Sequence, residues 1–399
     1  MSFIKNFKIA LIAVSVFFCG GLVLAESPNY TVDSSNYMQY ADKLSEGQIK
    51  AFETYSNFRI DVFPSTEECP LPSHAVSEKN ATMVNGNEGL ADFELGTKPF
   101  PNPTEAQHYI WNHRMTGPYV QSVHRTLTAY IVKNDGSFSV GQGDNYIEFP
   151  GAKGSPIKGL VDDNIHALYM VKNESPARIA GTLTMLHDFI DAAVQERKSW
   201  QYSPATRRVR RAPSVNYDTF IDATGGLATI DSYNMFTGAQ DRFNWNIVGE
   251  RVVLIPHGNT AMANATADMI TSHRNFPNPD LVRYEEKNVV IIEASLKEGS
   301  RHIFPKHLMY ITQDPMGQIM IRDQYDGQGN LLKHQYATRA VDASGGCRIN
   351  AETTLDFPTR GYVMNNVLGS GHDDLEVTYN TTNMGINFYS PDGLRRFAR

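Results

Sequence analysis

Four arginines lie within five positions of the chain, at Arg207, Arg208, Arg210 and Arg211. If this segment is a strand, Arg208 and Arg210 share one face, while Arg207 and Arg211 point the other way. Guanidinium groups suit paired hydrogen bonds to carboxylates and phosphates, so the segment could dock an anionic lipid or a partner protein. The alternative is that the arginines form ion pairs with acids of the same chain, such as Asp218, Asp222, Asp231 and Asp241.

Motifs for hydrolysis and for phosphate binding are missing from the sequence. The segment Leu368-Gly-Ser-Gly-His372 is out of register with a Gly-x-Ser-x-Gly nucleophile elbow. Gly141-Gln-Gly143 lacks the third glycine of a dinucleotide-binding loop and is read as a hairpin turn. The sequence therefore predicts no catalytic residue and no cofactor.

Histidines and carboxylates also lack the spacing of a metal or acid–base site. His302 and His307 are five positions apart, which suits neither one helix face nor one strand face. We therefore predict no metal site. An unrecognised envelope hydrolase is kept as an alternative function, with His302 beside Asp323 or Glu293 as its first candidate residues.

Residues 1–25 have the pattern of a secretory signal peptide. Lys5 and Lys8 precede an apolar run from Ile9 to Phe18, and Val23-Leu24-Ala25 fits a cleavage site. The run is shorter than the roughly 20 residues that span a bilayer, so we expect cleavage after Ala25 and no transmembrane segment in the exported chain. The net charge of −7 over 399 residues gives no support for nucleic-acid binding.

Two cysteines, Cys69 and Cys347, remain after the expected cleavage. Export would place them in an oxidising compartment, where they could form a disulfide. That bridge would close a very long loop and would tie the amino-terminal region to the carboxy-terminal one. The alternative is two buried, reduced thiols.

The remaining chain divides into residues 26–118 and residues 119–399, which we expect to form one structural unit. The first part contains a polar arm, a helical pattern from Met38 to Tyr55 and a proline-rich wrap over residues 61–103. A Thr104–Gln107 capping box predicts a short helix after the wrap. The second part is rich in strand patterns, including a meander over residues 307–340. Long neighbouring strands with few helices predict an α+β, mainly β fold with one large antiparallel sheet.

Several segments of the chain, in the same order, resemble the exported bacterial proteins of domain-of-unknown-function family 1329. These proteins are often labelled outer-membrane lipoprotein-sorting proteins. The resemblance covers about residues 38–340. It rests on Tyr40-Ala-Asp-Lys-Leu-Ser-Glu-Gly47, Pro99-Phe-Pro-Asn-Pro103, Ile110-Trp-Asn-His113, Arg207-Arg-Val-Arg-Arg-Ala-Pro213, Met235-Phe-Thr-Gly238, Asp241-Arg-Phe-Asn-Trp245, Arg283-Tyr284, Gly299-Ser-Arg-His302 and Asp323-Gln-Tyr-Asp-Gly327.

The resemblance implies a fold similar to the lipoprotein carrier LolA and the receptor LolB. That fold is a strongly curved antiparallel sheet, a half-open barrel with helices across its mouth and an apolar cavity inside. The resemblance implies no catalytic residues, because none are established for the family. It also implies an association with outer-membrane barrels or with export pumps of the resistance-nodulation-division type.

We therefore predict a periplasmic, non-enzymatic binding or carrier protein that works at the outer membrane. Its expected ligand is hydrophobic, such as a lipid or the acyl chains of a lipoprotein, because each buried methylene contributes about 0.8 kcal/mol. The alternative is an interaction or scaffold partner of an envelope transport complex, either an outer-membrane barrel or an export pump. In that case the four arginines and the proline-rich wrap would form the docking surface.

Overall fold

The computed structural model describes most of the chain after the expected signal peptide, which itself lies outside the described residues. The described ranges are 27–66, 69–71, 80–116, 120–159, 164–192, 194–212, 217–263, 265–341, 347–367, 378–379 and 384–398.

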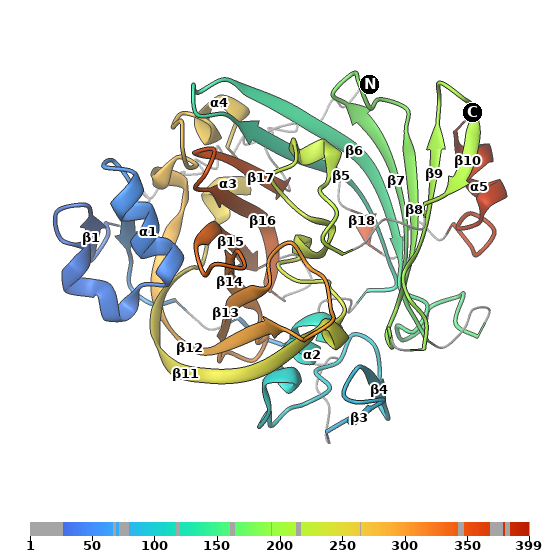
Figure 1. Cartoon of the computed structure of the whole chain (residues 1–399), viewed down its shortest axis with the longest axis horizontal. Helices are drawn as coiled ribbons and strands as arrows, with labels where there is room; N and C mark the ends of the chain where they lie inside the picture. The colour runs from blue at the N-terminus through green and yellow to red at the C-terminus, as the bar shows by residue number, and fades with distance from the viewer. Residues whose placement is uncertain are drawn as a thin grey trace, which may run out of the picture.

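In these ranges, one curved sheet of sixteen strands dominates the fold (Figure 1). It does not close into a barrel, which confirms the predicted mainly β fold with a large, open, curved antiparallel sheet. From one edge to the other the strands are β1 (Tyr30–Asp33), β2 (Arg59–Val62), β12 (Arg283–Leu296), β13 (Lys306–Thr312), β14 (Ile319–Tyr325), β15 (Leu331–Val341), β16 (Cys347–Asp356), β17 (Gly361–Val367), β5 (Ser122–Val132), β6 (Phe138–Glu148), β7 (Ile165–Ser175), β8 (Leu183–Phe189), β9 (Lys198–Ser203) and β10 (Arg208–Arg211).

The other two of the sixteen strands lie outside this order. β11 (Phe243–Pro256) pairs with β12 along almost its whole length, and β18 (Thr378–Tyr379) pairs with β5. Neighbouring strands run antiparallel except for β2, which pairs in parallel with β12. A separate ribbon is formed by β3 (Thr82–Val84) and β4 (Gly89–Ala91). The main sheet therefore includes β1 and β2 from residues 26–118 as well as strands from residues 119–399.

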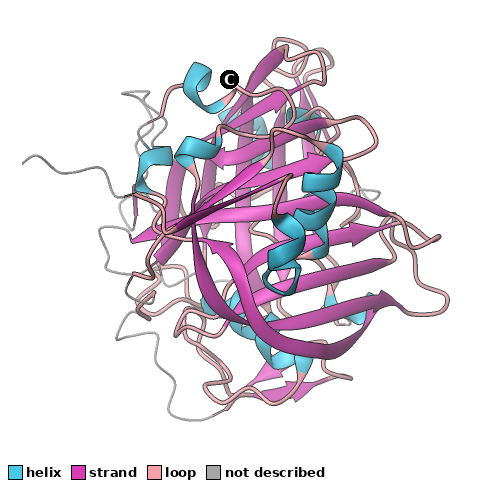
Figure 2. Ribbon diagram, turned by 90° about the vertical axis from the view of Figure 1, so that its left-hand side faces the viewer, coloured by secondary structure: helices cyan, strands magenta, loops and turns pink. Residues whose placement is uncertain are grey.

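Short helices lie against the curved wall of strands (Figure 2). They are η1 (Tyr37–Lys43), α1 (Glu46–Thr54), α2 (Ala106–Thr116), η3 (Asp222–Thr224), η4 (Ile230–Ser232), η5 (Gln240–Arg242), α3 (Thr260–Ala263), α4 (Ala267–Ile270), η6 (Pro279–Leu281) and α5 (Pro391–Phe397). None of the helices in the described ranges combines the length and apolarity that a membrane crossing requires.

The expected helix from Met38 to Tyr55 is two helices, because Leu44 has extended backbone angles. α1 then begins at a capping box in which the Ser45 and Gln48 side chains bind each other's backbone N–H groups. The start of α2 differs from the sequence expectation. The N–H groups of Thr104 and Glu105 donate to Nδ1 of His108, which takes the place of the expected Thr104–Gln107 box.

The core consists of a large apolar cluster and smaller ones. In the large cluster, Ala51 and Phe52 of α1 and the preceding Leu44 pack with apolar residues of the sheet. A second cluster surrounds Trp111 of α2 and contains both Cys69 and Cys347. Their sulfur atoms form a disulfide, with 5.4 Å between the two Cα atoms. The bridge joins the proline-rich wrap to the start of β16.

Gly141 and Gly143 lie within strand β6, so the hairpin turn expected there is wrong. Glycine suits this strand because another segment crosses it closely. A Cβ atom on Gly141 would lie 2.5 Å from the carbonyl oxygen of Ala223. The crossing segment, residues 217–240, has little regular structure and contains η3 and η4. Its Leu227 and Ala228 pack against Ala129 and Ile131 of β5.

Candidate ligand-binding cavity

A cavity of about 630 Å³ lies between strands β5–β10 and the crossing segment. This volume lies within the range of about 300–1,000 Å³ that is typical of small-molecule sites. Its wall is mostly apolar, with Leu127, Ala129, Val171, Ile179, Leu186, Phe220, Ile221 and Ile230 among the lining residues. The cavity is therefore large enough and apolar enough to hold a hydrophobic molecule.

Strand register places a row of side chains on the face of the sheet that borders the cavity. One row of directly opposed residues crosses six neighbouring strands, and directly opposed side chains point to the same face. The row consists of Arg125, Asn145, Val171, Thr184, Gln201 and Arg210. It begins at a cation on β5 and ends at a cation on β10, with the apolar cavity between them.

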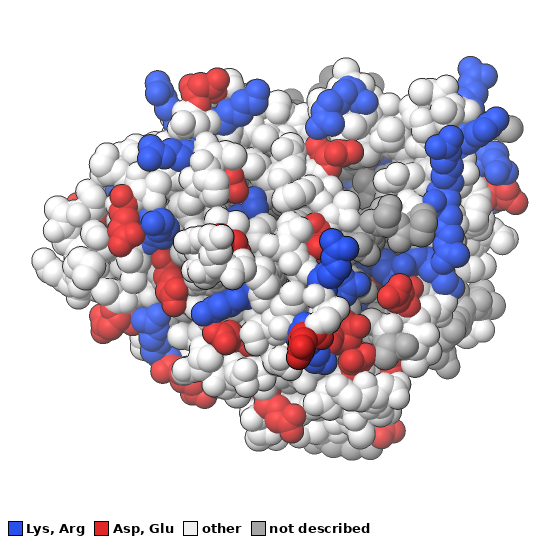
Figure 3. Space-filling view, in the orientation of Figure 1, with Lys and Arg blue, Asp and Glu red and all other residues white. Residues whose placement is uncertain are grey.

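The arginine segment forms β10, at the outer edge of this wall. Arg208 and Arg210 line the cavity, as their shared strand face suggests. All four arginines are exposed, and none of them forms an ion pair with another described residue. A column of basic side chains runs over the part of the surface occupied by β9 and β10 (Figure 3).

Two of the four acids named as internal partners of the arginines have other contacts. Asp231 binds Arg322 and faces His302, and a carboxylate oxygen of Asp218 accepts the N–H of Ile303. The alternative in which the four arginines are neutralised by acids of the same chain is therefore wrong for the described acids.

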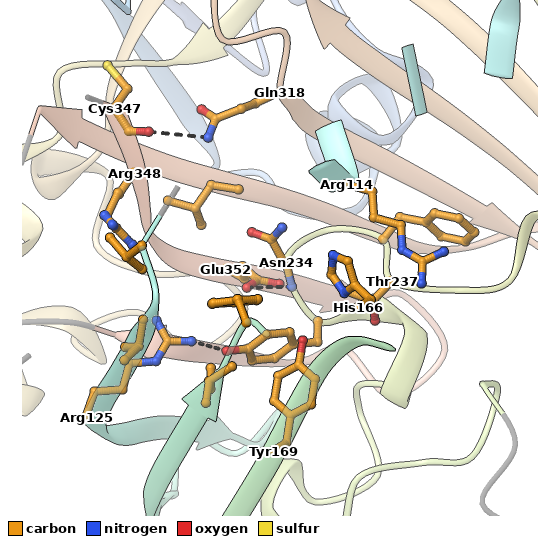
Figure 4. A pocket seen from close by; sticks show the side chains of 17 residues that line it. Arg114, Arg125, His166, Tyr169, Asn234, Thr237, Gln318, Cys347, Arg348 and Glu352 are labelled. Carbon is orange, nitrogen blue, oxygen red and sulfur yellow. Dashed lines mark hydrogen bonds between the residues drawn. The ribbon is translucent and has the colours of Figure 1, made fainter. Parts of the chain in front are cut away.

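A smaller pocket of about 110 Å³ adjoins the cavity and shares Tyr169, Tyr233 and Thr237 with it. Figure 4 shows Arg125 and Arg348 on one side of this pocket, with Arg114 and His166 on the other. Arg125 donates a hydrogen bond to the Tyr233 hydroxyl, and its guanidinium lies 5.8 Å from the centre of that ring. Burial raises the pKa of Tyr233, so the hydroxyl stays neutral.

A buried cluster around Asp188 adds positive charge to both spaces. The Asp188 carboxylate lies 3.0 Å from Nε of Arg197 and 3.4 Å from Nη2 of Arg114. Burial alone would raise the pKa of Asp188, but the two guanidinium charges outweigh it and hold that pKa well below its usual range. Burial lowers the pKa of the neighbouring His166, so the ring is neutral. Two cations thus face one carboxylate.

The residues considered for a hydrolase are not brought together. His302 Nε2 lies 3.2 Å from Asp231, whereas Asp323 lies 2.6 Å from Nδ1 of His334. Glu293 forms a partly exposed ion pair with Lys306 at 3.1 Å. His302 therefore has neither of its suggested partners.

Asp231, His302 and His307 offer potential metal-ligand atoms within 4.8 Å of one another. Their environment does not suit a cation, because Arg322 already donates to Asp231 at 2.7 Å and to Nδ1 of His307 at 3.3 Å. Burial alone would raise the pKa of Asp231, but the charge of Arg322 outweighs it and lowers that pKa. The guanidinium of Arg322 therefore occupies the position next to these ligand atoms that a metal ion would need. Asp231, His302 and His307 form a structural hydrogen-bond network with Arg322.

The comparisons with known proteins agree with the family resemblance. The family model for the "protein of unknown function" family DUF1329 matches residues 31–395. The chain is 32% identical over 318 residues to the uncharacterized protein PA3922 of Pseudomonas aeruginosa, covering 77% of this chain and 69% of the relative.

Solved structures that align with this chain share little of its sequence. A proposed outer membrane lipoprotein-sorting protein domain from Vibrio parahaemolyticus aligns with a TM-score of 0.49 and 13% identity, over 73% of this chain and 97% of that one. A DUF1329 family protein from Desulfovibrio piger aligns with a TM-score of 0.48 and 13% identity, over 72% and 97%. Because the family model spans most of its length, the chain belongs to the DUF1329 family.

Proposed function

We propose that this protein is a periplasmic, non-enzymatic carrier that holds a hydrophobic ligand, a lipid or the acyl chains of a lipoprotein, at the outer membrane. The observation that carries this proposal is the mostly apolar cavity of about 630 Å³ on the inner face of β5–β10. The signal-peptide pattern of residues 1–25 supports the assignment to the periplasm.

The energy of apolar burial favours a ligand with a long hydrocarbon chain. Burial of ten methylenes is worth about 8 kcal/mol, which would match a micromolar dissociation constant if association cost nothing. Association costs at least about 4 kcal/mol in lost freedom, so tight binding needs a chain well beyond ten methylenes. A long-chain lipid meets this requirement, and a short-chain metabolite does not.

Native mass spectrometry of protein purified from the periplasm tests the proposal. We expect a co-purified lipid that organic extraction releases. The purified protein should also enhance the fluorescence of N-phenylnaphthylamine, an apolar probe. Protein that is free of lipid in several preparations and does not bind the probe would contradict the proposal.

A variant in which large side chains fill the cavity tests whether the probe binds at this site. Val171 and Thr184 oppose each other on β7 and β8 and line the cavity, so Val171→Trp/Thr184→Trp should reduce probe binding at least about tenfold. The matched control is Gln328→Trp, in the exposed turn between β14 and β15. Equal loss of binding in both variants would show that the probe binds elsewhere.

A further inference from the structure

We propose that the ligand of this cavity is an anionic amphiphile whose charged group is bound by Arg208 and Arg210 at the outer edge of the sheet. This inference rests on the proposed function, because it places the apolar chain of the ligand in the same cavity. It adds the charge of the ligand and the position of its head group.

The charge of the lining favours an anion. Arg208, Arg210 and Arg197 line the cavity, whereas Asp222 is the one acid among its described lining residues, and it is exposed. Arg208 and Arg210 form no ion pair with a described residue, so their guanidinium groups can bind a ligand. Guanidinium groups bind carboxylates and phosphates through paired, charge-assisted hydrogen bonds.

Arg197 brings a further donor to the wall. Its Nε is held by Asp188 at 3.0 Å and its Nη2 donates to the carbonyl of Thr237 at 3.1 Å. Its Nη1 is buried without a hydrogen-bond partner. Asp188 pairs with both Arg114 and Arg197, and its single negative charge cannot neutralise two guanidinium groups. The three residues therefore keep an excess of positive charge beside the cavity.

The position of the two edge arginines suits a head group better than that of Arg125. Arg208 and Arg210 are exposed, so an anion bound there keeps part of its hydration. Arg125 is already bonded to Tyr233 and lies beside the small pocket of about 110 Å³. The row from Arg210 to Arg125 crosses five inter-strand spacings, or about 24 Å, which leaves room for a long extended chain.

The experiment compares two ligands that have the same chain and differ in head-group charge, oleate and oleyl alcohol. Both are titrated below their aggregation limits against the delipidated full chain, by displacement of N-phenylnaphthylamine. We expect oleate to bind at least about tenfold more tightly than oleyl alcohol. The preference should shrink as salt rises from about 0.01 M to 1 M, because the screening length falls from about 30 Å to 3 Å.

Paired variants locate the head group. Arg208→Gln/Arg210→Gln should reduce the preference for oleate to less than about twofold and leave the affinity for oleyl alcohol unchanged. The control is Arg207→Gln/Arg211→Gln, which removes the same charge from the same segment and should keep the preference.

Three results would overturn the inference. The wild-type protein could bind both ligands equally, the preference could survive in Arg208→Gln/Arg210→Gln, or Arg125→Gln could remove it instead. Survival in the edge variant would show that these two arginines do not bind the head group. If the wild-type protein bound neither ligand, the proposed carrier function itself would also fail, which distinguishes that failure from one of charge recognition.

Discussion

The backbone N–H of Gly47 donates a hydrogen bond to Oδ2 of Asp323 at 2.8 Å. The other carboxylate oxygen of Asp323 lies 2.6 Å from Nδ1 of His334. Through this contact the first turn of α1 rests directly on β14 and β15. A Cβ atom on Gly47 would lie 2.1 Å from Oδ1 of Asp323 and from Nδ1 of His334, so only glycine fits.

Gly47→Ala should therefore lower the free energy of unfolding by about 1–3 kcal/mol, as expected for overpacking in a buried contact. The gain in helix propensity from alanine, about 1 kcal/mol, opposes this only in part. Urea unfolding measures the difference. Gly249→Ala is the control, since a Cβ atom at Gly249 would meet nothing within 4 Å. A stable Gly47→Ala variant would show that α1 does not rest on Asp323.

Glu285 should make stability depend on acid pH. Burial alone would raise the pKa of Glu285, but hydrogen bonds from Lys287, Thr66 and Arg283, together with the charge of His257, lower it to about 2. Since the folded-state pKa lies below the ordinary value of 4.5, this contribution is complete above about pH 4.5 and is lost as the pH falls towards 2.

The loss should reach about 3 kcal/mol at most, measured by urea unfolding at several pH values between 6 and 2.5. Glu285→Gln should flatten this part of the pH profile. Glu298→Gln, at an exposed turn position, should keep it. An unchanged slope in Glu285→Gln would assign the acid sensitivity to other carboxylates.

The disulfide between Cys69 and Cys347 closes a loop with a sequence separation of 278. Cys69→Ser/Cys347→Ser should lower the free energy of unfolding by about 2–5 kcal/mol, because the bridge limits the freedom of the unfolded chain. Alkylation of the unfolded, unreduced protein from the periplasm should find no free thiol. Two reactive thiols would mean that the bridge does not form in the cell.

Arg322 and Asp231 form a fully buried ion pair at 2.7 Å. Arg322→Met would leave the carboxylate uncompensated, so we expect a loss of about 3–5 kcal/mol. The double variant Arg322→Met/Asp231→Asn should lose less than Arg322→Met alone, because no buried charge remains. Thermal unfolding of the two variants checks this order. The opposite order would mean that the carboxylate is stabilised by groups other than Arg322.

Local patterns in the sequence predicted much of the sheet. Alternation and turn residues identified β14 and β15, and the face shared by Arg208 and Arg210 follows from strand geometry alone. The segment Ser45-Glu-Gly-Gln48 also reads as a capping box, which would have separated η1 from α1.

The family resemblance implies an apolar cavity, but the place and the lining of the cavity could not be predicted, because they depend on contacts between distant parts of the chain. The row from Arg125 to Arg210 exists only after five pairings set the register, and a slip by one residue would turn each side chain to the other face. The crossing segment has no helical or strand periodicity in its sequence that would predict its place beside the cavity. Gly141 offered a weak signal, since glycine inside a strand often marks the close approach of another backbone.

The end of the sheet at β10 also bears on how copies of the protein behave together. An open sheet leaves backbone groups at its border that could continue the hydrogen-bond ladder into another molecule. Here that border is four residues long and bears exposed arginines, so two such borders repel each other. The same charges that could attract a ligand therefore also oppose edge-to-edge pairing of two molecules through β10.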